Sequence, residues 1–360
     1  MNNRSRTDIQ EAARRVYHFM MHSKPEDWGG HVWTDWAMNI DKWDWNPGVG
    51  IIAAAEYGRA TGDSSVLQEV EGWVRRNRGQ SEEVRVINSM APYAIFPQLY
   101  KATGDVYYLE KAVEIAEWMV EQAPRTSEGA FEHTVTENAR FSEQIWADTV
   151  FMAVLFLART ARLTGNRKHA EEALLQALLH LRALQDEDTG LLFHGWDGSA
   201  GNWMSAARWN RANGWNAAGI PMILEEAEKL CRDSDLLHEL KYRYGRLIEA
   251  LAACQLPGGM WPTVLDRPGF YEETSGSAAI ALGLYKAVRM ELASEQLLPY
   301  ADRALAAIVP MVAATGAVSG VSGGTPVLES ERAYNEVPLF PTLYGQGLVL
   351  LLLSEVIEQR

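Results

Sequence analysis

A three-residue signature recurs along this chain and constrains its fold more than any other feature. Thr61-Gly62-Asp63, Thr103-Gly104-Asp105 and Thr164-Gly165-Asn166 each follow one apolar helical pattern and precede a second. Glycine adopts the left-handed conformation that ends many helices, and Asp or Asn caps the start of the next helix. Each signature therefore predicts a helical hairpin.

The hairpins are predicted to close into a ring. Weaker turns over 232–235 and 290–298 bring the count to at least five hairpins, with a helix left over at each end. Their spacing is irregular, at roughly 40 to 65 residues, and longer than a tetratricopeptide unit of ~34. This pattern favours an all-α (α/α)6 barrel of about twelve helices, in one domain over 1–360. An open solenoid is the alternative, but neither chain end looks like a polar capping repeat.

Long polar connections, rich in Trp and Gly, alternate with the short turns. They span 26–47, 124–143, 187–214 and 257–274. Short turns at one end of the hairpins and long loops at the other indicate that the loops wall a pocket.

Composition excludes several classes of protein. A net charge of −14 argues against a nucleic-acid partner. The longest apolar run, Leu348 to Leu353, is far shorter than the roughly 20 residues that cross a membrane. The first residues contain no apolar signal core, so a cytoplasmic protein is expected.

The usual signs of a cofactor or a disulfide framework are also missing from the sequence. The two cysteines, Cys231 and Cys254, lie in helical patterns without a C-x-x-C partner and are predicted to be packing residues. H-E-x-x-H, phosphate-binding and dinucleotide-binding motifs do not occur, and no cofactor is predicted.

Most of the thirteen tryptophans lie beside polar residues in glycine-broken stretches. A flat ring with a polar edge stacks on the C–H face of a sugar, so these residues indicate a carbohydrate-binding surface. Trp73 and Trp118 lie in amphipathic stretches and are predicted to be core residues. Trp43 and Trp45 either floor a pocket or plug one end of the barrel.

Asp148 is predicted to face a polar cavity. Ser142-Glu-Gln144 is typical of a helix start, which places Asp148 about a turn and a half inside a helix that continues as the apolar run Val150 to Phe156. An ionised carboxylate there is costly unless it is paired or faces a polar space, and capping does not fit so deep a position. Gln144 would share its face, whereas spacing does not place Trp146 in the site.

A second polar segment runs from Trp209 to Trp215. Asn213-Gly214 predicts a turn, so Trp209 and Arg211, two apart in an extended lead-in, can project the same way. The planar guanidinium suits a carboxylate. The alternative, a surface ion pair, does not account for both tryptophans. Glu272 and Glu273, farther along, either belong to a site or open a helix as a capping box.

These segments resemble the unsaturated rhamnogalacturonyl hydrolases of glycoside hydrolase family 105, relatives of the unsaturated glucuronyl hydrolases. The resemblance runs nearly end to end, and it is the order and spacing of the segments that is specific. They are 43–50, Asn88-Ser-Met-Ala-Pro92, the Thr-Gly-Asp hairpins, Gln144-Ile-Trp-Ala-Asp-Thr149, His194-Gly-Trp-Asp197, Trp209-Asn-Arg-Ala-Asn-Gly-Trp215, Glu273-Thr-Ser-Gly276 and Gly345-Gln-Gly347.

The resemblance implies an (α/α)6 barrel that acts on lyase products ending in a uronic acid with a C4=C5 double bond. In the implied mechanism one aspartic acid protonates C4 and then helps water add at C5. The resulting hemiketal collapses and releases the shortened sugar and a 4-deoxy-5-keto uronate. By motif match this residue is Asp148, and a carboxyl that gives and takes a proton near neutral pH is expected to have a raised pKa.

The same match implies the residues that surround the sugar. His194, Arg211 and Trp215 are expected around the unsaturated uronate, with Arg211 on its carboxylate. The further residues are Trp209 and Trp146 as walls, His133 near the acid, and Trp45 as a more loosely matched aromatic ring. The expected partner is a small acidic unsaturated oligosaccharide, and the expected state is a monomer or a small homo-oligomer.

Asn88 stands where some relatives have a second aspartate, so a scheme with two carboxylates does not transfer to this chain. Asn88 either hydrogen-bonds the substrate or the acid, or it caps a helix that begins near Ser89.

Two other functions compete with this interpretation. One is an ordinary inverting glycosidase on the same barrel, which would pair Asp148 with Asp197 or Glu273 at a separation of roughly 6.5 to 9.5 Å. The other is a sugar-binding α-hairpin protein without chemistry, which would need no buried acid.

Overall fold

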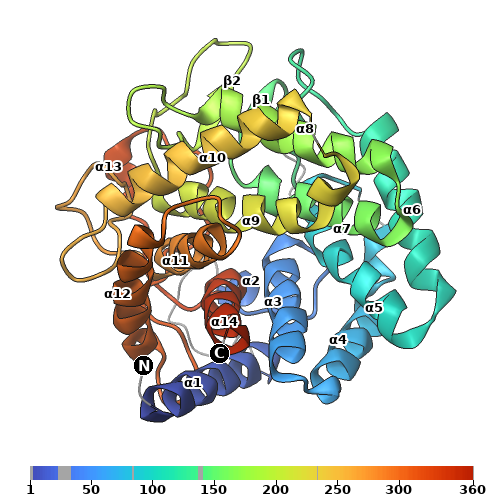
Figure 1. Cartoon of the computed structure of the whole chain (residues 1–360), viewed down its shortest axis with the longest axis horizontal. Coiled ribbons are helices and arrows are strands. Elements are labelled where there is room, and N and C mark those ends of the chain that lie inside the picture. The colour runs from blue at the N-terminus through green and yellow to red at the C-terminus, as the bar shows by residue number, and fades with distance from the viewer. Residues whose placement is uncertain (1–2, 23–33, 83–84, 137–140, 233, 360) are drawn as a thin grey trace.

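The structure, a computed structural model, describes residues 3–22, 34–82, 85–136, 141–232 and 234–359, and two concentric layers of helices make up the molecule (Figure 1). The inner helices line the axis of the ring. They are α3 (Trp45–Thr61), η2 with α5 (Asn88–Ile95, Phe96–Thr103), η3 with α7 (Val150–Val154, Leu155–Thr164), α9 (Asn210–Ala227), α11 (Thr274–Arg289) and α14 (Leu343–Glu358).

The outer helices alternate with the inner ones along the chain. They are α1 (Asn3–His22), α4 (Ser64–Asn77), α6 (Val106–Glu121), α8 (Arg167–Leu184), α10 (Asp235–Ala253) and α12 (Leu298–Ile308). The last inner helix, α14, packs against both α1 and α3, so the helices left over at the chain ends pair with each other and close the ring (Figure 1). The prediction of an (α/α)6 barrel is confirmed.

The short turns have the predicted geometry. The glycines of the 61–63, 103–105 and 164–166 signatures are left-handed, with φ of 70°, 70° and 69°. The Asp or Asn that follows each glycine accepts a hydrogen bond from a backbone N–H of the next helix. These contacts join residues close in sequence, which explains why the sequence alone predicts them.

Shorter elements lie in the connections between these helices. A two-stranded antiparallel sheet joins β1 (Gln144–Trp146) to β2 (Gly195–Asp197). The remaining pieces are α2 (Thr34–Ala37), η1 (Gln80–Glu82), η4 (Glu228–Leu230), η5 (Glu295–Leu297), η6 (Val309–Met311) and α13 (Glu331–Tyr334).

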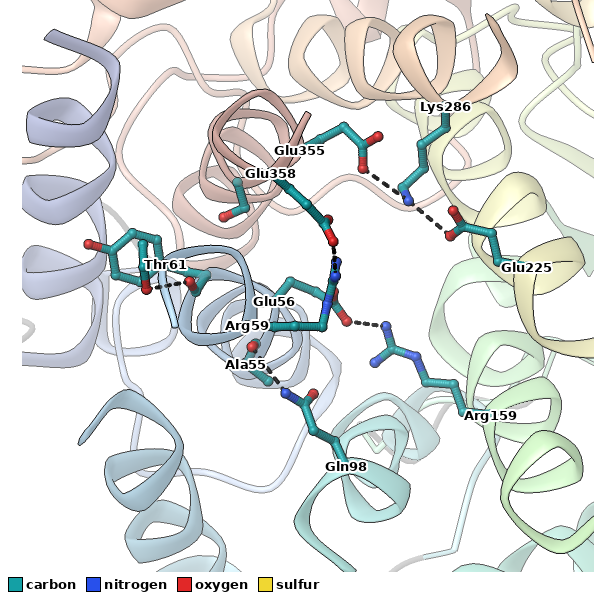
Figure 2. Close-up of polar contacts among 12 residues, drawn as sticks. Ala55, Glu56, Arg59, Thr61, Gln98, Arg159, Glu225, Lys286, Glu355 and Glu358 are labelled. Atoms are coloured by element: carbon teal, nitrogen blue, oxygen red, sulfur yellow. Dashed lines mark hydrogen bonds and ion pairs between the residues drawn. The ribbon is translucent and has the colours of Figure 1, made fainter. Parts of the chain in front are cut away.

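Ion pairs join the inner helices at the end of the barrel where these helices finish, as Figure 2 shows. Lys286 of α11 lies 2.9 Å from Glu225 of α9 and 3.1 Å from Glu355 of α14. These side chains line a cavity at this end of the barrel, and on its other side Glu56 of α3 lies 2.5 Å from Arg159 of α7. Burial acts to raise the pKa of Glu56 and Glu355, but the neighbouring cations hold both pKa values below the ordinary value. Cations here also complement the negative ends of the helix dipoles.

We expect Lys286→Met to lower the free energy of unfolding by about 2 to 3 kcal/mol, because it removes one charge-assisted contact from Glu225 and one from Glu355, and Glu355 stays buried. The Glu355 side chain is only 3% exposed, and Arg289 remains as its partner. The matched control is Lys168→Met, since Lys168 is 66% exposed and its ion pair with Glu121 should contribute less than about 1 kcal/mol. Chemical denaturation of both variants measures the difference. Equal losses would show that the buried pairs add nothing.

Candidate active site

A pocket opens at the opposite end of the barrel, where the inner helices begin. Its walls come from five of the six inner positions or the loops before them, and most of the lining is aromatic. The lining residues are Trp36, Trp45, Asn88, His133, Val135, Phe141, Trp146, Asp148, Trp209, Arg211, Gly324, Thr325 and Pro326. Three of the four long connections therefore wall the pocket as predicted, whereas 257–274 contributes no lining residue and the 324–326 segment takes part instead.

Asp148 does not lie inside a helix, and the sequence-based prediction is wrong on this point. Residues 144–146 form strand β1, which pairs with β2, and the helix begins only after Asp148. The Asp148 carbonyl accepts hydrogen bonds from the backbone N–H groups of Phe151 and Met152, both at 3.1 Å. Pairing with a distant strand overrides the local helix-start signal, so Gln144 and Asp148 share no helical face.

The Asp148 carboxylate presents its two oxygens to different surroundings. Oδ2 is buried and lies 3.3 Å from Nε2 of His194. Neither atom has an aligned hydrogen-bond partner among the described residues, so the two are in close contact but not in ideal hydrogen-bond geometry. Because the Asp148 side chain is 13% exposed while Oδ2 is buried, we assign Oδ1 as the oxygen that faces the pocket.

The pKa of Asp148 is lowered, contrary to the expected rise. Burial acts to raise it, but His194, His133 and Arg211 together outweigh burial and bring it below the ordinary value of 3.8. A position just before a helix also favours the ionised form, because the positive end of the helix dipole lies there. Asp148 is therefore a carboxylate at neutral pH when the pocket is empty.

Two histidines lie beside Asp148, and both are neutral. His133 stacks on Trp146 with ring centroids 4.1 Å apart, and burial lowers its pKa to about 4. Burial also lowers the pKa of His194, although Asp148 opposes this shift. The Nδ1 atom of His194 lies 2.7 Å from the hydroxyl of Tyr334. The site thus keeps neutral imidazoles around one carboxylate.

Arg211 lies in the first turn of α9, and the turn predicted at Asn213-Gly214 is wrong because both residues are helical. A Cβ at position 214 would lie 3.1 Å from the carbonyl oxygen of Gly276 in α11, so the glycine permits close helix packing. Trp209 and Arg211 still meet, as predicted. The guanidinium carbon lies 4.3 Å from the Trp209 ring centre and 4.5 Å from that of Tyr344.

The Arg211 guanidinium is also held by hydrogen bonds, and its ion pair is buried rather than on the surface. It lies 3.5 Å from Glu273, whose side chain is fully buried. It donates to the carbonyls of Ser322 and Gly323 at 3.1 and 2.9 Å, and more weakly to the Thr325 hydroxyl at 3.3 Å. Arg211 therefore fixes the 322–325 segment, which forms part of the pocket wall.

The helix ends explain how an acidic protein can offer an anion-binding pocket. The inner helices begin around this pocket, with α3 at Trp45, η2 at Asn88, α9 at Asn210 and α14 at Leu343. Helix N-termini carry partial positive charge and unpaired N–H groups, which favour anions. Together with Arg211 they are the groups at this end of the barrel that can attract an anion, despite the net charge of −14.

The structure separates the predicted site residues into two groups. Seven line the pocket, namely Trp45, Asn88, His133, Trp146, Asp148, Trp209 and Arg211. His194 lies behind Asp148 and contacts it. Trp215 does not reach the pocket, because it is fully buried on the core side of α9 and packs against Phe151 at 5.2 Å.

Asn88 lines the pocket rather than capping a helix. Its Oδ1 is buried and has no hydrogen-bond partner among the described residues, and η2 begins without a side-chain cap. Trp45 lines the pocket, whereas Trp43 packs in the aromatic core beside Trp73, so the pocket alternative holds for Trp45 alone. Trp73 is fully buried as predicted, and Trp118 is partly buried. Trp33 lies outside the described residues.

Some lining residues escaped the sequence analysis. Phe141 follows residues that carry no motif, whereas Trp36 was one of the polar-flanked tryptophans that indicated a carbohydrate-binding surface. The 324–326 segment carried one usable signal, a Gly-Gly-Thr-Pro run in a long connection near the C-terminal end.

Neither candidate for a second catalytic carboxylate lines the pocket. Glu273 caps α11 by accepting from the Gly276 N–H at 2.6 Å, which confirms the capping alternative. Asp197 on β2 accepts from the Ala200 N–H at 3.0 Å. Asp148 is the one acid among the lining residues that the structure describes.

Metal and membrane features are not found in the described part of the chain. No group of three or more His, Cys, Asp or Glu side chains in these residue ranges is placed to hold a metal ion. No described helix is both long enough and apolar enough to cross a membrane.

A six-hairpin barrel with an aromatic pocket around one acid defines a carbohydrate-active hydrolase. The chain matches the model of Glycosyl Hydrolase Family 88 over residues 12–359. The protein belongs to this family.

Individual relatives agree with the family match. The chain is 35% identical over 325 residues to the unsaturated rhamnogalacturonyl hydrolase YesR of Bacillus subtilis, covering 88% of this chain and 90% of the relative. A crystal structure from Salmonella enterica, described as a possible GH105 member, superposes with a TM-score of 0.90 at 30% identity, covering 98% of this chain and 94% of that one. The unsaturated glucuronyl hydrolase of Bacillus sp. GL1 shares the fold, with a TM-score of 0.67 at 16% identity over 96% and 94% of the two chains.

Proposed function

We propose that this protein removes the terminal 4,5-unsaturated uronic acid from oligosaccharides that polysaccharide lyases produce. The observation that carries the proposal is a pocket in which Asp148 is the one carboxylic acid among the lining residues that the structure describes, with aromatic rings around it. Direct hydrolysis by inversion needs two carboxylates that flank the scissile bond. Hydration of the C4=C5 double bond needs one group that first gives and then takes a proton.

The steps of the reaction balance with Asp148 alone. Oδ1 delivers its proton to C4, and water attacks C5 while passing a proton back to Asp148. The ring then opens to a ketone at C5, and the hemiacetal left at C1 breaks to an aldehyde and the free hydroxyl of the next sugar. The net change is the addition of one water, and the glycosidic carbon is never attacked directly.

Binding of the substrate raises the pKa of Asp148, which then takes up from solvent the proton that it lacks in the empty site. Asp148 is ionised in the free protein. A uronate carboxylate that enters beside it disfavours a second negative charge, and displaced water weakens solvation of that charge. Both effects raise the pKa of Asp148 in the complex.

Arg211 and the helix N-termini around the pocket are the groups we assign to the uronate carboxylate. The weakest bond of the guanidinium to a pocket residue is the 3.3 Å contact with the Thr325 hydroxyl. A carboxylate can replace this contact without disturbing the shorter bonds to the 322–323 carbonyls. Trp45, Trp146, Trp209, His133 and Asn88 surround the sugar in this proposal.

The substrate test is a panel of disaccharides from rhamnogalacturonan, glycosaminoglycan and algal lyases, followed by loss of the double-bond absorbance. The name of the Bacillus subtilis relative makes unsaturated rhamnogalacturonan disaccharide the first to try. We expect turnover of unsaturated substrates and none of the saturated counterparts. Release of sugar from a saturated disaccharide at a comparable rate would favour the ordinary glycosidase. Binding of either disaccharide without turnover would favour the non-catalytic protein.

The cytoplasmic location and the monomeric or small oligomeric state stay predictions.

A further inference from the structure

We propose that Tyr334 is a positioning residue that holds the proton of His194 on Nε2, so that this nitrogen donates toward Asp148. The link from Tyr334 to His194 stands on geometry alone. Its effect on catalysis rests on the proposed function of Asp148.

Tyr334 reaches the site from outside the pocket. It ends α13 (Glu331–Tyr334), a short helix between the long outer and inner helices near the end of the chain. Its side chain is fully buried, and its ring packs against those of His194 and Trp209, with both centroid distances 5.7 Å. Its hydroxyl lies 2.7 Å from Nδ1 of His194. Tyr334 therefore contacts the imidazole on the side away from Asp148.

The proton on the hydroxyl has one acceptor with suitable geometry. The backbone N–H of Leu328 donates to the Tyr334 hydroxyl at 3.1 Å, so this contact does not use the hydroxyl proton. Ser205 lies near enough to influence the pKa of Tyr334, but its Oγ has no aligned hydrogen-bond partner among the described residues. Burial raises the pKa of Tyr334 to about 12, so the proton is retained. The remaining acceptor is Nδ1 of His194.

This assignment fixes the tautomer of His194. Burial lowers the pKa of His194, so the ring is neutral and carries one proton. If Nδ1 accepts from Tyr334, that proton must lie on Nε2. Nε2 lies 3.3 Å from Oδ2 of Asp148. The opposite tautomer would place an unprotonated nitrogen, instead of an N–H, 3.3 Å from a carboxylate oxygen, which is less favourable.

A donor at Oδ2 has two consequences for Asp148. It leaves Oδ1 free to exchange a proton with the substrate, and it favours the ionised carboxylate. The other charged or titratable groups that act on Asp148 are His133 and Arg211. The contact with His194 is not yet aligned in the empty pocket, and catalytic hydrogen bonds often tighten only when substrate binds.

The first experiment reads the tautomer directly. Nitrogen-15 NMR of histidine-labelled protein distinguishes an unprotonated ring nitrogen from a protonated one, with His194→Gln used to assign the signals. We expect Nδ1 of His194 to be unprotonated and Nε2 protonated. A protonated Nδ1 in the unaltered protein would overturn the proposal, whatever the activity of any variant.

The second experiment removes the hydroxyl with Tyr334→Phe. Nδ1 then loses its donor, and His194 no longer favours the Nε2–H form. We expect kcat to fall about 10- to 100-fold, as for other residues that orient a catalytic ligand, with KM changed less than about twofold. The pKa of Asp148 should rise, because a group that stabilises its ionised form is weakened. Since the acid must be protonated in the complex to act, the pH at which kcat declines should move upward.

Tyr271→Phe is the matched control. The Tyr271 hydroxyl donates to the Tyr334 carbonyl at 3.0 Å, so this variant loosens the same segment without touching His194. We expect it to keep the His194 tautomer, the pH profile and kcat. If both variants lose kcat equally with an unchanged tautomer, Tyr334 only anchors the chain and the positioning role is wrong. If Asp148→Asn stays active while the NMR result holds, the proposed function fails and the tautomer assignment survives.

Discussion

Asp148→Asn should lose activity on unsaturated disaccharides by about 10²-fold to 10⁴-fold or more, while the barrel stays folded. The amide has nearly the shape of the carboxyl but cannot give a proton to C4 or take one from water. Loss of the double-bond absorbance measures the activity, and circular dichroism with thermal melting checks the fold. We expect only a modest loss of stability, because Oδ2 has no aligned bond to lose among the described residues, although the amide forfeits the interactions that lower the pKa of Asp148.

The control for this variant is Asp197→Asn. Asp197 lies on β2, the strand paired with the strand that precedes Asp148, but it does not line the pocket. If the proposed hydration mechanism is right, Asp197→Asn keeps its activity within about fivefold of the unaltered protein. The loss of a group that transfers protons would be much larger. A loss as large as that of Asp148→Asn would instead indicate a pair of catalytic carboxylates. Full activity of Asp148→Asn would remove Asp148 from the mechanism.

Arg211→Met should have the second large effect, on both stability and binding. It leaves the fully buried Glu273 without its cation and releases the 322–325 segment, and we expect a loss of about 3 to 5 kcal/mol in the free energy of unfolding. Chemical denaturation measures this loss. Affinity for an unsaturated disaccharide should fall about tenfold or more, because a charge-assisted hydrogen bond contributes about 1.5 to 3 kcal/mol.

A double variant separates the two roles of Arg211. Arg211→Met with Glu273→Gln removes the stranded charge, and much of the lost stability should return. Calorimetric titration in an Asp148→Asn background then measures binding without turnover. If Arg211 binds the uronate carboxylate, affinity stays low in the double variant. Recovery of affinity together with stability would show that Arg211 acts only by holding the pocket wall.

Both variants test residues that the sequence brought forward, yet their surroundings differ from those expected. Ser142-Glu-Gln144 has the local features of a helix start, but this stretch pairs with β2 from a distant part of the chain. Asn213-Gly214 has the features of a turn, but Gly214 lies within α9 and allows this helix to pack closely against α11. Local propensity is a weak guide where a long-range contact offers more stabilisation.

The pKa of Asp148 and the place of Trp215 show the same limit. An apolar neighbourhood in the sequence suggested a raised pKa, but the neighbours that lower it, His133, His194 and Arg211, come from other parts of the barrel. Trp215 carries a motif match to the site, yet its ring points into the core. Tyr334 had no motif at all, and only the folded chain places its hydroxyl on His194.

The sequence by itself determined the hairpins, their closure into a barrel and the end of the barrel that carries the long loops. These features depend on left-handed glycines, Asp and Asn caps and helical periodicity, which act over a few residues. Only the tertiary structure decided which rings face the pocket, why the Asp148 carboxylate is ionised when the pocket is empty, and how Arg211 and Tyr334 are used. Those properties depend on groups that are distant in the chain and become neighbours only when the ring closes. Electrostatic and hydrogen-bond energies depend on the distance between groups in space, not on their separation in the sequence.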